Sequence, residues 1–224
     1  MIQEFNFKNR IEMNRQYFEN IDGTAALVEE EIRNGLEFID HYEEPMVSVL
    51  GGAQVKKKSR HYKLAYETGY LLGEEGYAVA TGGGIGIMEA ANQGAKDGGG
   101  ISLGIKAELI KGEKVRKMVH TDEISLHFVF VRRFLLAIKS QALIFFPGGY
   151  GTLSEFFEFL VLMKLDIGDD VPLIFVDKKY WQGLFDWLHK NPAKEGLLKF
   201  DPQDIDLLRF AETAPQVIRI VKGL

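Results

Sequence analysis

Residues 141–158, QALIFFPGGYGTLSEFFE, form the stretch that decides the fold. The apolar run Ala142–Phe146 is typical of a strand buried on both faces, and Pro147 ends it. The glycine-rich turn 148–151 then allows backbone angles that a Cβ would forbid. Thr152 is expected to open a helix with one apolar side, formed by Leu153, Phe156, Phe157, Leu160 and Val161. Such a strand, turn and helix place backbone N–H groups at a positive helix N-terminus, where an anion such as phosphate can bind.

A second interpretation of these residues needs no ligand. Thr152 and Glu155 have the spacing of a capping box, in which Glu155 only stabilises the start of the helix. The glycines would then form nothing more than a tight turn.

Two earlier segments repeat the pattern of strand and glycine turn. The expected strand Met46–Leu50 precedes Gly-Gly-Ala-Gln at 51–54, and the expected strand Tyr77–Ala80 precedes Thr-Gly-Gly-Gly-Ile-Gly at 81–86. The second turn has neither the dinucleotide spacing nor the Gly-Lys-Ser/Thr of a P-loop. The basic cluster that follows the first turn is interpreted as a solvated helix start, because cations oppose the dipole there; it contains Lys56, Lys57, Lys58 and Arg60.

The rest of the chain alternates in the same way. A helix capped by Thr24 is expected within residues 1–44, and a helix from Phe130 should bury one stripe and place Arg132 and Arg133 on its flanks. That stripe is Phe130, Val131, Phe134, Leu135 and Ile138. Further strands are expected at 101–105, 172–176 and 207–210, with a short one at 117–120, and further helices at 87–96, 180–189 and 213–221. Trp181, Phe185 and Trp187 are interpreted as packing residues.

Nearly continuous apolar strands that alternate with helices predict an α/β fold. We expect a doubly wound, Rossmann-like parallel sheet at 45–224 with an N-terminal helical extension at 1–44. Ligands of such folds bind beyond the carboxyl ends of the strands, so the three glycine turns should converge on one crevice.

Composition excludes several classes of function. A net charge of −5 gives no indication of nucleic-acid binding, and the absence of cysteine excludes disulfides and thiolate chemistry. The N-terminus lacks the pattern of a signal peptide, and no apolar run approaches the roughly 18 residues of a membrane span. A cytoplasmic protein with no membrane partner is expected.

Two motifs carry a resemblance to a known family. Pro147–Glu155, PGGYGTLSE, resembles the PGGxGTxxE signature of the LOG family of phosphoribohydrolases. Residues 81–92, TGGGIGIMEAAN, are similar to that family's TGGGPGIMEAAN, with Ile85 where proline is usual. The Arg132-Arg133 pair stands at the spacing of the family's Arg-Lys pair, and the likeness covers about residues 45–190.

The resemblance implies hydrolysis of the N-glycosidic bond of a purine nucleoside 5′-monophosphate, AMP or an N6-modified AMP, to free base and ribose 5-phosphate. It implies that Arg132 and Glu155 are catalytic, without metal or cofactor, in a homodimer or a higher homo-oligomer. It assigns substrate binding to Gly82, Gly83, Gly84, Glu89, Asn92, Glu108, Arg133, Gly148, Gly149, Gly151 and Thr152. Gly52 and Gln54 depart from the family, since many relatives have serine and arginine there. The 106–116 loop lacks the usual proline, which leaves open whether Glu108 or Glu113 faces the ligand.

The residue types agree with this chemistry. A carboxylate can stabilise the oxocarbenium-like ribosyl cation, and a fixed guanidinium can neutralise charge on the departing base. The alternative is a non-catalytic nucleotide or molybdenum-cofactor carrier of the same fold. Lysine decarboxylation is disfavoured, because no lysine stands in a strand-end or glycine context suited to pyridoxal phosphate.

Overall fold

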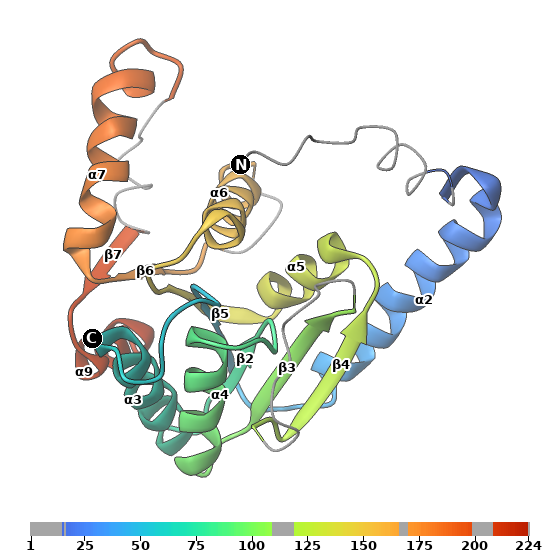
Figure 1. The fold of residues 1–224 in the computed structure, drawn as a ribbon, viewed down its shortest axis with the longest axis horizontal. Helices are drawn as coiled ribbons and strands as arrows, with labels where there is room; N and C mark the ends of the chain where they lie inside the picture. Colours follow the sequence, from blue (N-terminus) through green and yellow to red (C-terminus); the bar gives the residue numbers. More distant parts are fainter. Residues whose placement is uncertain (1–14, 16, 109–118, 166–169, 199–207, 224) are drawn as a thin grey trace, which may run out of the picture.

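The computed structural model describes residues 15, 17–108, 119–165, 170–198 and 208–223. These residues contain one seven-stranded sheet with the order β4-β3-β2-β1-β5-β6-β7 (Figure 1). The strands are β1 (Met46–Leu50), β2 (Ala78–Thr81), β3 (Ser102–Ala107), β4 (Asp122–Leu126), β5 (Ser140–Phe145), β6 (Leu173–Val176) and β7 (Leu208–Ala211).

Every neighbouring pair of strands is parallel. The strands β1, β2 and β6 are buried along their whole length, as expected where helices cover both faces of a sheet. The chain runs outward from β1 to β4, returns to place β5 beside β1, and then continues to β7. The doubly wound Rossmann-like fold is confirmed, and its topological switch point lies between β1 and β5.

Two layers of helices enclose the sheet. One face packs against α2 (Ile21–Asp40), α5 (Val129–Ile138), α6 (Tyr150–Lys164) and α7 (Lys178–Leu188), which continues into the π-helical turn η1 (His189–Ala193). The other face packs against α3 (Arg60–Glu74), α4 (Ile87–Asp97) and α9 (Ala214–Val221). Figure 1 shows α3, α4 and α9 grouped together, away from α5 and α6. Within the described ranges, none of the helices has the length and hydropathy that crossing a bilayer requires.

Helices α3 and α4 approach unusually closely because glycines line their contact. A Cβ on Gly69 of α3 would lie 2.1 Å from the carbonyl oxygen of Ala91, and one on Gly94 of α4 would lie 2.0 Å from that of Tyr66. Backbone therefore packs directly on backbone, which holds α4 and the glycine turn before it against the sheet.

The N-terminal helix begins earlier than the sequence predicts. Asn20 caps α2, and its side chain accepts a hydrogen bond from the Gly23 N–H at 3.0 Å, so Thr24 lies inside the helix. Asn is as good an N-cap as Thr, and the sequence offers both. The helical structure expected for residues 1–14 and 16 lies outside the described residues.

The predicted position of the edge strand β4 is wrong. The predicted strand at 117–120 lies partly outside the described residues, and 119 and 120 are not in a strand. The observed strand, Asp-Glu-Ile-Ser-Leu at 122–126, is at the edge of the sheet and exposes most of its residues. An edge strand needs no apolar run, so hydrophobicity alone does not reveal it.

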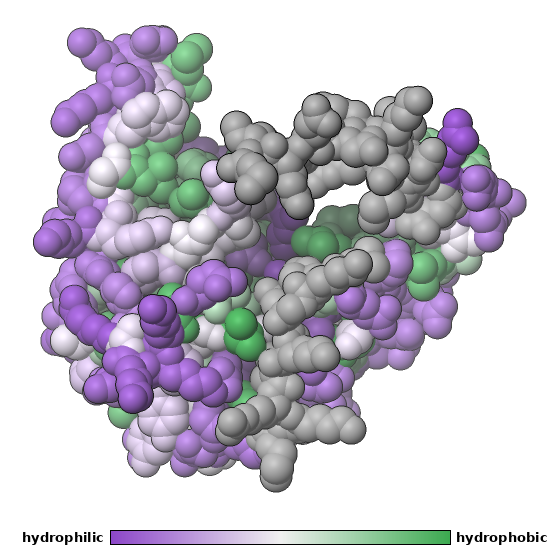
Figure 2. Space-filling model, in the orientation of Figure 1, coloured by the Kyte–Doolittle hydropathy of each residue, from purple (hydrophilic) through white to green (hydrophobic). Residues whose placement is uncertain are grey.

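The stripe predicted for α5 is confirmed at Val131 and Leu135 and wrong at its other three positions. Val131, Leu135 and Leu136 are fully buried, whereas Phe130, Phe134 and Ile138 are 51%, 37% and 46% exposed. The helix buries the face that includes Arg132, which therefore points inward instead of reaching out from a flank. Apolar surface over α5 is visible in the hollow between α2 and α6 (Figure 2). Trp181 is buried as predicted, but Trp187 is 56% exposed and is not a packing residue.

The glycine contact between α3 and α4 gives a stability prediction. Gly69→Ala should destabilise the fold by about 1–3 kcal/mol, because the added methyl group overlaps the backbone of α4. The matched control is Gly183→Ala in α7, where no atom of the described residues lies within 4 Å of the added Cβ. There alanine should stabilise the helix by up to about 1 kcal/mol. Urea unfolding of both variants measures the difference, and equal effects would contradict this packing.

Candidate active site

A cavity of about 550 Å³ lies at the switch point, at the carboxyl ends of β1 and β5. All three glycine turns contribute to its wall, through residues 51–55, Gly82 and residues 147–149. Other lining residues come from helices: Met88, Arg132, Gly151, Thr152, Glu155 and Tyr180. The crevice expected from the fold is therefore present, and segments distant in the sequence form it together.

Gly52 joins the three turns by hydrogen bonds. Its N–H donates to the Pro147 carbonyl at 3.0 Å, and its own carbonyl accepts from the Ile87 N–H at 3.2 Å. A Cβ on Gly86, whose φ is +73°, would lie 2.4 Å from the same Gly52 carbonyl oxygen. Position 86 thus requires glycine for two reasons: its positive φ and its close contact with the Gly52 carbonyl oxygen.

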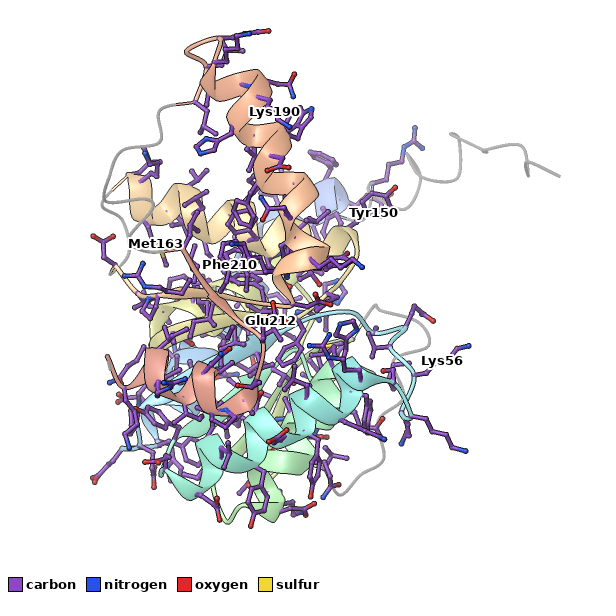
Figure 3. All side chains as sticks on the ribbon, turned by 90° about the vertical axis from the view of Figure 1, so that its left-hand side faces the viewer. Lys56, Tyr150, Met163, Lys190, Phe210 and Glu212 are labelled. Carbon is purple, nitrogen blue, oxygen red and sulfur yellow. The ribbon has the colours of Figure 1, made fainter. Side chains whose placement is uncertain are left out.

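The N-terminus of α6 faces the cavity without a side-chain cap. The N-cap is Gly149, no side chain of the described residues caps the helix, and Thr152 lies buried in its first turn. The capping-box interpretation of Thr152 and Glu155 is therefore wrong, because Thr152 is not at the N-cap position. The first-turn N–H groups lack intrahelical partners and carry the positive end of the dipole, so they suit an anion. Tyr150, 94% exposed, projects on the same side of the molecule as Lys56 (Figure 3).

Arg132 and Glu155 face each other in the cavity wall. Arg132 Nη2 lies 3.5 Å from Glu155 Oε1, and each side chain is only 10% exposed. Arg132 Nε and Nη1 are buried, and neither has a hydrogen-bond partner among the described residues. Buried donors are rarely left unpaired, so these two groups are available to a ligand. Glycine at position 82 makes room for this arrangement, since a Cβ there would come within 3.3 Å of Arg132 Cζ.

Burial raises the pKa of the Glu155 carboxyl to about 7. The positive charges of Arg132 and Arg133 act in the opposite direction, while the negative charge of Glu158 raises the pKa further. A carboxyl group that changes charge near neutral pH in a cavity is typical of catalytic sites.

Arg133 lies outside the cavity wall. It forms an ion pair with Glu158 through Nη1, which also donates to Ser154 Oγ at 3.2 Å. The predicted contact with substrate has no support in this geometry, because Glu158 on α6 holds the guanidinium.

Asn92 is a structural residue here. It is fully buried, its Oδ1 accepts from Thr81 Oγ1 at 2.5 Å, and its Nδ2 donates to Ser102 Oγ at 2.9 Å and to the Leu103 carbonyl at 3.1 Å. These bonds tie α4 to β2 and β3, and the side chain does not line the cavity.

The other predicted binding residues divide into two groups. Gly82, Gly148, Gly149, Gly151 and Thr152 line the cavity, whereas Gly83, Gly84, Glu89 and Glu108 do not. Glu89 is buried and pairs with Lys57 at 2.6 Å, and Glu108 is exposed beyond β3. Most of the 106–116 loop lies outside the described residues. The three lysines of the basic cluster precede α3, and Arg60 is the first residue of that helix, after its N-cap Ser59.

Tyr180 is a cavity residue that the sequence analysis missed. Its hydroxyl donates to the Gly148 carbonyl at 2.5 Å. The available signal was its position in the first turn of the helix after β6, at the same edge of the sheet as the glycine turns.

Comparison with known proteins identifies the family. The family model described as "Possible lysine decarboxylase" matches residues 88–221. A cytokinin riboside 5′-monophosphate phosphoribohydrolase of Arabidopsis thaliana, LOG3, is 29% identical over 175 residues, which cover 77% of this chain and 80% of that protein. The chain belongs to the LOG family. The cytokinin riboside 5′-monophosphate phosphoribohydrolase of Rhodococcoides fascians is 28% identical over 156 residues, 68% of this chain and 77% of that one.

Solved structures of this fold include molybdenum-cofactor proteins. The molybdenum cofactor binding protein of Rippkaea orientalis has a TM-score of 0.60 and 26% identity, and the match covers 81% of this chain and 97% of that chain. The Moco carrier protein of Chlamydomonas reinhardtii has a TM-score of 0.57 at 21% identity, covering 81% and 97%, and indicates the fold alone.

The buried carboxyl gives a prediction for stability against pH. The folded chain keeps a proton on Glu155 up to a pKa of about 7, above the ordinary value of 4.5, so the folded state binds more protons than the unfolded state between those values. This contribution to stability is present below pH 4.5 and is lost as pH rises toward 7 and above. Glu155→Gln removes it, so the variant should gain up to about 3 kcal/mol relative to wild type between pH 4.5 and 8. Urea unfolding of both proteins across this pH range is the measurement. A difference in the free energy of unfolding that does not change with pH would contradict the raised pKa of Glu155.

Proposed function

We propose that this protein hydrolyses the N-glycosidic bond of a purine nucleoside 5′-monophosphate, AMP or an N6-modified AMP, to free base and ribose 5-phosphate. The observation that carries the proposal is the Arg132–Glu155 pair, buried in a cavity beside the uncapped N-terminus of α6. An anion site and a carboxylate in one cavity are what a phosphorylated sugar with a cationic transition state requires.

Each group has a defined part in this reaction. The phosphate binds the N–H groups at the start of α6, which places the ribose in the cavity. Ionised Glu155 stabilises the ribosyl cation and orients the water whose oxygen bonds to C1′ as the C1′–N bond breaks. The base leaves with the bonding electron pair, and Arg132 Nε and Nη1 donate hydrogen bonds to its developing negative charge. A proton from the water neutralises the products.

The names of two relatives support this interpretation of the site. Both, from Arabidopsis thaliana and Rhodococcoides fascians, are named phosphoribohydrolases of a riboside 5′-monophosphate. Lysine decarboxylation has no support, since the residues lining the cavity in the described part of the chain include no lysine. Lys139 instead donates to the Ile39 carbonyl at 2.9 Å, near the end of α2.

The second candidate is a carrier of a nucleotide-like cofactor, which the likeness to the Rippkaea orientalis protein favours. One assay separates the candidates: pure protein is incubated with a panel of nucleoside 5′-monophosphates, and free base and ribose 5-phosphate are quantified. Release of both in equal amounts supports the hydrolase. Tight binding of molybdenum cofactor with no release from any nucleotide would favour the carrier.

Phosphate should be required for recognition, because we propose that the N-terminus of α6 binds it. The kcat/KM for AMP should exceed that for adenosine by at least about a hundredfold, as expected when several N–H bonds to a charged group are lost. Equal kcat/KM values for the two would rule out this binding mode.

Glu155 and Arg132 should act in the chemical step. Glu155→Gln and Arg132→Lys should each lower kcat on the order of a hundredfold with less change in KM, the usual size for one electrostatic group. Arg133→Lys is the matched control, since it keeps a charge beside Glu158 outside the cavity and should retain most activity. In wild type, activity should rise with pH through about 7 as Glu155 ionises. If Arg133→Lys and not Arg132→Lys lowered kcat, the two roles would be reversed.

We also propose that a second copy of the chain covers the exposed apolar side of α5. Phe130, Phe134 and Ile138 recur at intervals of one helical turn, and Val161 of neighbouring α6 is 52% exposed. Sedimentation equilibrium should give at least a dimer for wild type, and Phe130→Glu combined with Phe134→Glu should shift it toward monomer. A monomeric wild type would refute this.

A further inference from the structure

The geometry points to Tyr180 as a positioning residue that fixes the phosphate-binding turn, an inference that rests on the proposed function. Its hydroxyl is the donor to the Gly148 carbonyl, and its side chain lines the cavity beside that turn. Tyr180 comes from α7, a different part of the chain from the turn it holds.

The peptide unit that Tyr180 holds is the one most free to rotate. It joins Gly148 to Gly149, and neither residue has a Cβ to restrict its backbone angles. If this unit flipped, its carbonyl oxygen would replace an N–H group on the opposite side, because the two lie on opposite edges of a trans peptide. A carbonyl oxygen turned toward a bound phosphate would repel it.

The preceding peptide is already fixed, since its carbonyl, on Pro147, accepts from the Gly52 N–H at 3.0 Å. On the other side the helical backbone begins at Tyr150. Tyr180 therefore fixes the Gly148–Gly149 peptide, which lies between the hydrogen-bonded Pro147 carbonyl and the first turn of α6. With both carbonyls bound to protein donors, the N–H groups of Gly148 and Gly149 point away from those donors.

A residue with positive φ stands at the start of α7, three residues before Tyr180. Asp177 has a φ of +70°, the one non-glycine residue with positive φ in the part of the chain described. Its side chain pairs with His61 Nε2 at 2.8 Å, and its carbonyl accepts from the Tyr180 N–H at 3.0 Å. A non-glycine residue in the left-handed region is strained and persists where its surroundings hold it, often at functional sites.

The Tyr180 hydroxyl is not needed to anchor α7. Trp181 is 1% exposed and donates to the Val176 carbonyl at 3.1 Å, and the Lys178 N–H donates to Glu212 at 2.9 Å. Tyr180 itself is 47% exposed. Loss of the hydroxyl should therefore change the turn and leave the helix in place.

The test compares Tyr180→Phe with Tyr66→Phe, a control that also loses one hydroxyl bond, to Asp97 at 2.8 Å, on the outer side of α3 and α4. Calorimetric titration with ribose 5-phosphate should give roughly five- to tenfold weaker binding for Tyr180→Phe, the loss expected for one hydrogen bond, and unchanged binding for Tyr66→Phe. On the nucleotide that wild type hydrolyses, KM should rise by the same factor with kcat within about twofold. Asp177→Gly, which keeps the backbone angle and loses the His61 contact, should weaken ribose 5-phosphate binding in the same direction.

Unchanged ribose 5-phosphate affinity in Tyr180→Phe, or wild type that does not bind this ligand, would overturn the inference. A Tyr180→Phe variant that loses kcat alone would do so as well. Wild type that binds ribose 5-phosphate but releases base from no nucleotide would contradict the proposed function, and the binding comparison would still decide the role of Tyr180.

Discussion

Two hydrogen bonds at Gly52 hold the site together. One reaches the turn after β5 and the other reaches the start of α4, so the turns that follow three strands are joined at a single residue. Position 52 has little space for a side chain, since a Cβ would lie 3.1 Å from the Pro147 carbonyl oxygen. Gly52 is thus part of the cavity wall, where it contributes backbone contacts and no side chain.

Burial determines the electrostatics of this wall. Arg132 and Glu155 are both largely removed from water, yet they lie 3.5 Å apart, and two guanidinium donors have no partner among the residues that the structure describes. A closer pair with two hydrogen bonds would lower the pKa of the Glu155 carboxyl and give the Arg132 donors a partner. The observed spacing leaves Glu155 with a raised pKa and Arg132 with free donors, which is a reactive arrangement more than a stabilising one.

Much of the fold follows from the sequence because the central strands are continuous apolar runs. Hydrophobic patterning predicted β1, β2, β5 and β6 within one or two residues, and glycine after three strands predicted the crevice. Hydrophobic patterning failed at β4, because this edge strand is polar and has no apolar run. It also failed on part of α5, because two faces of that helix are apolar and tertiary packing buries the face that includes Arg132. Local motifs also could not show that Asn92 joins strands, that Glu158 holds Arg133 or that Tyr180 reaches Gly148, because each partner is distant in sequence.

The switch point has a consequence for how the molecule unfolds. Strands β1 to β4 form one half of the sheet and β5 to β7 the other, and the pairing of β1 with β5 is the one strand contact between the halves in the described chain. A ligand in the cavity touches both halves, since the wall includes residues that follow β1 and residues that follow β5. The binding energy of the ligand therefore stabilises the contact between β1 and β5. A bound ligand should make the two halves of the sheet unfold as one cooperative unit.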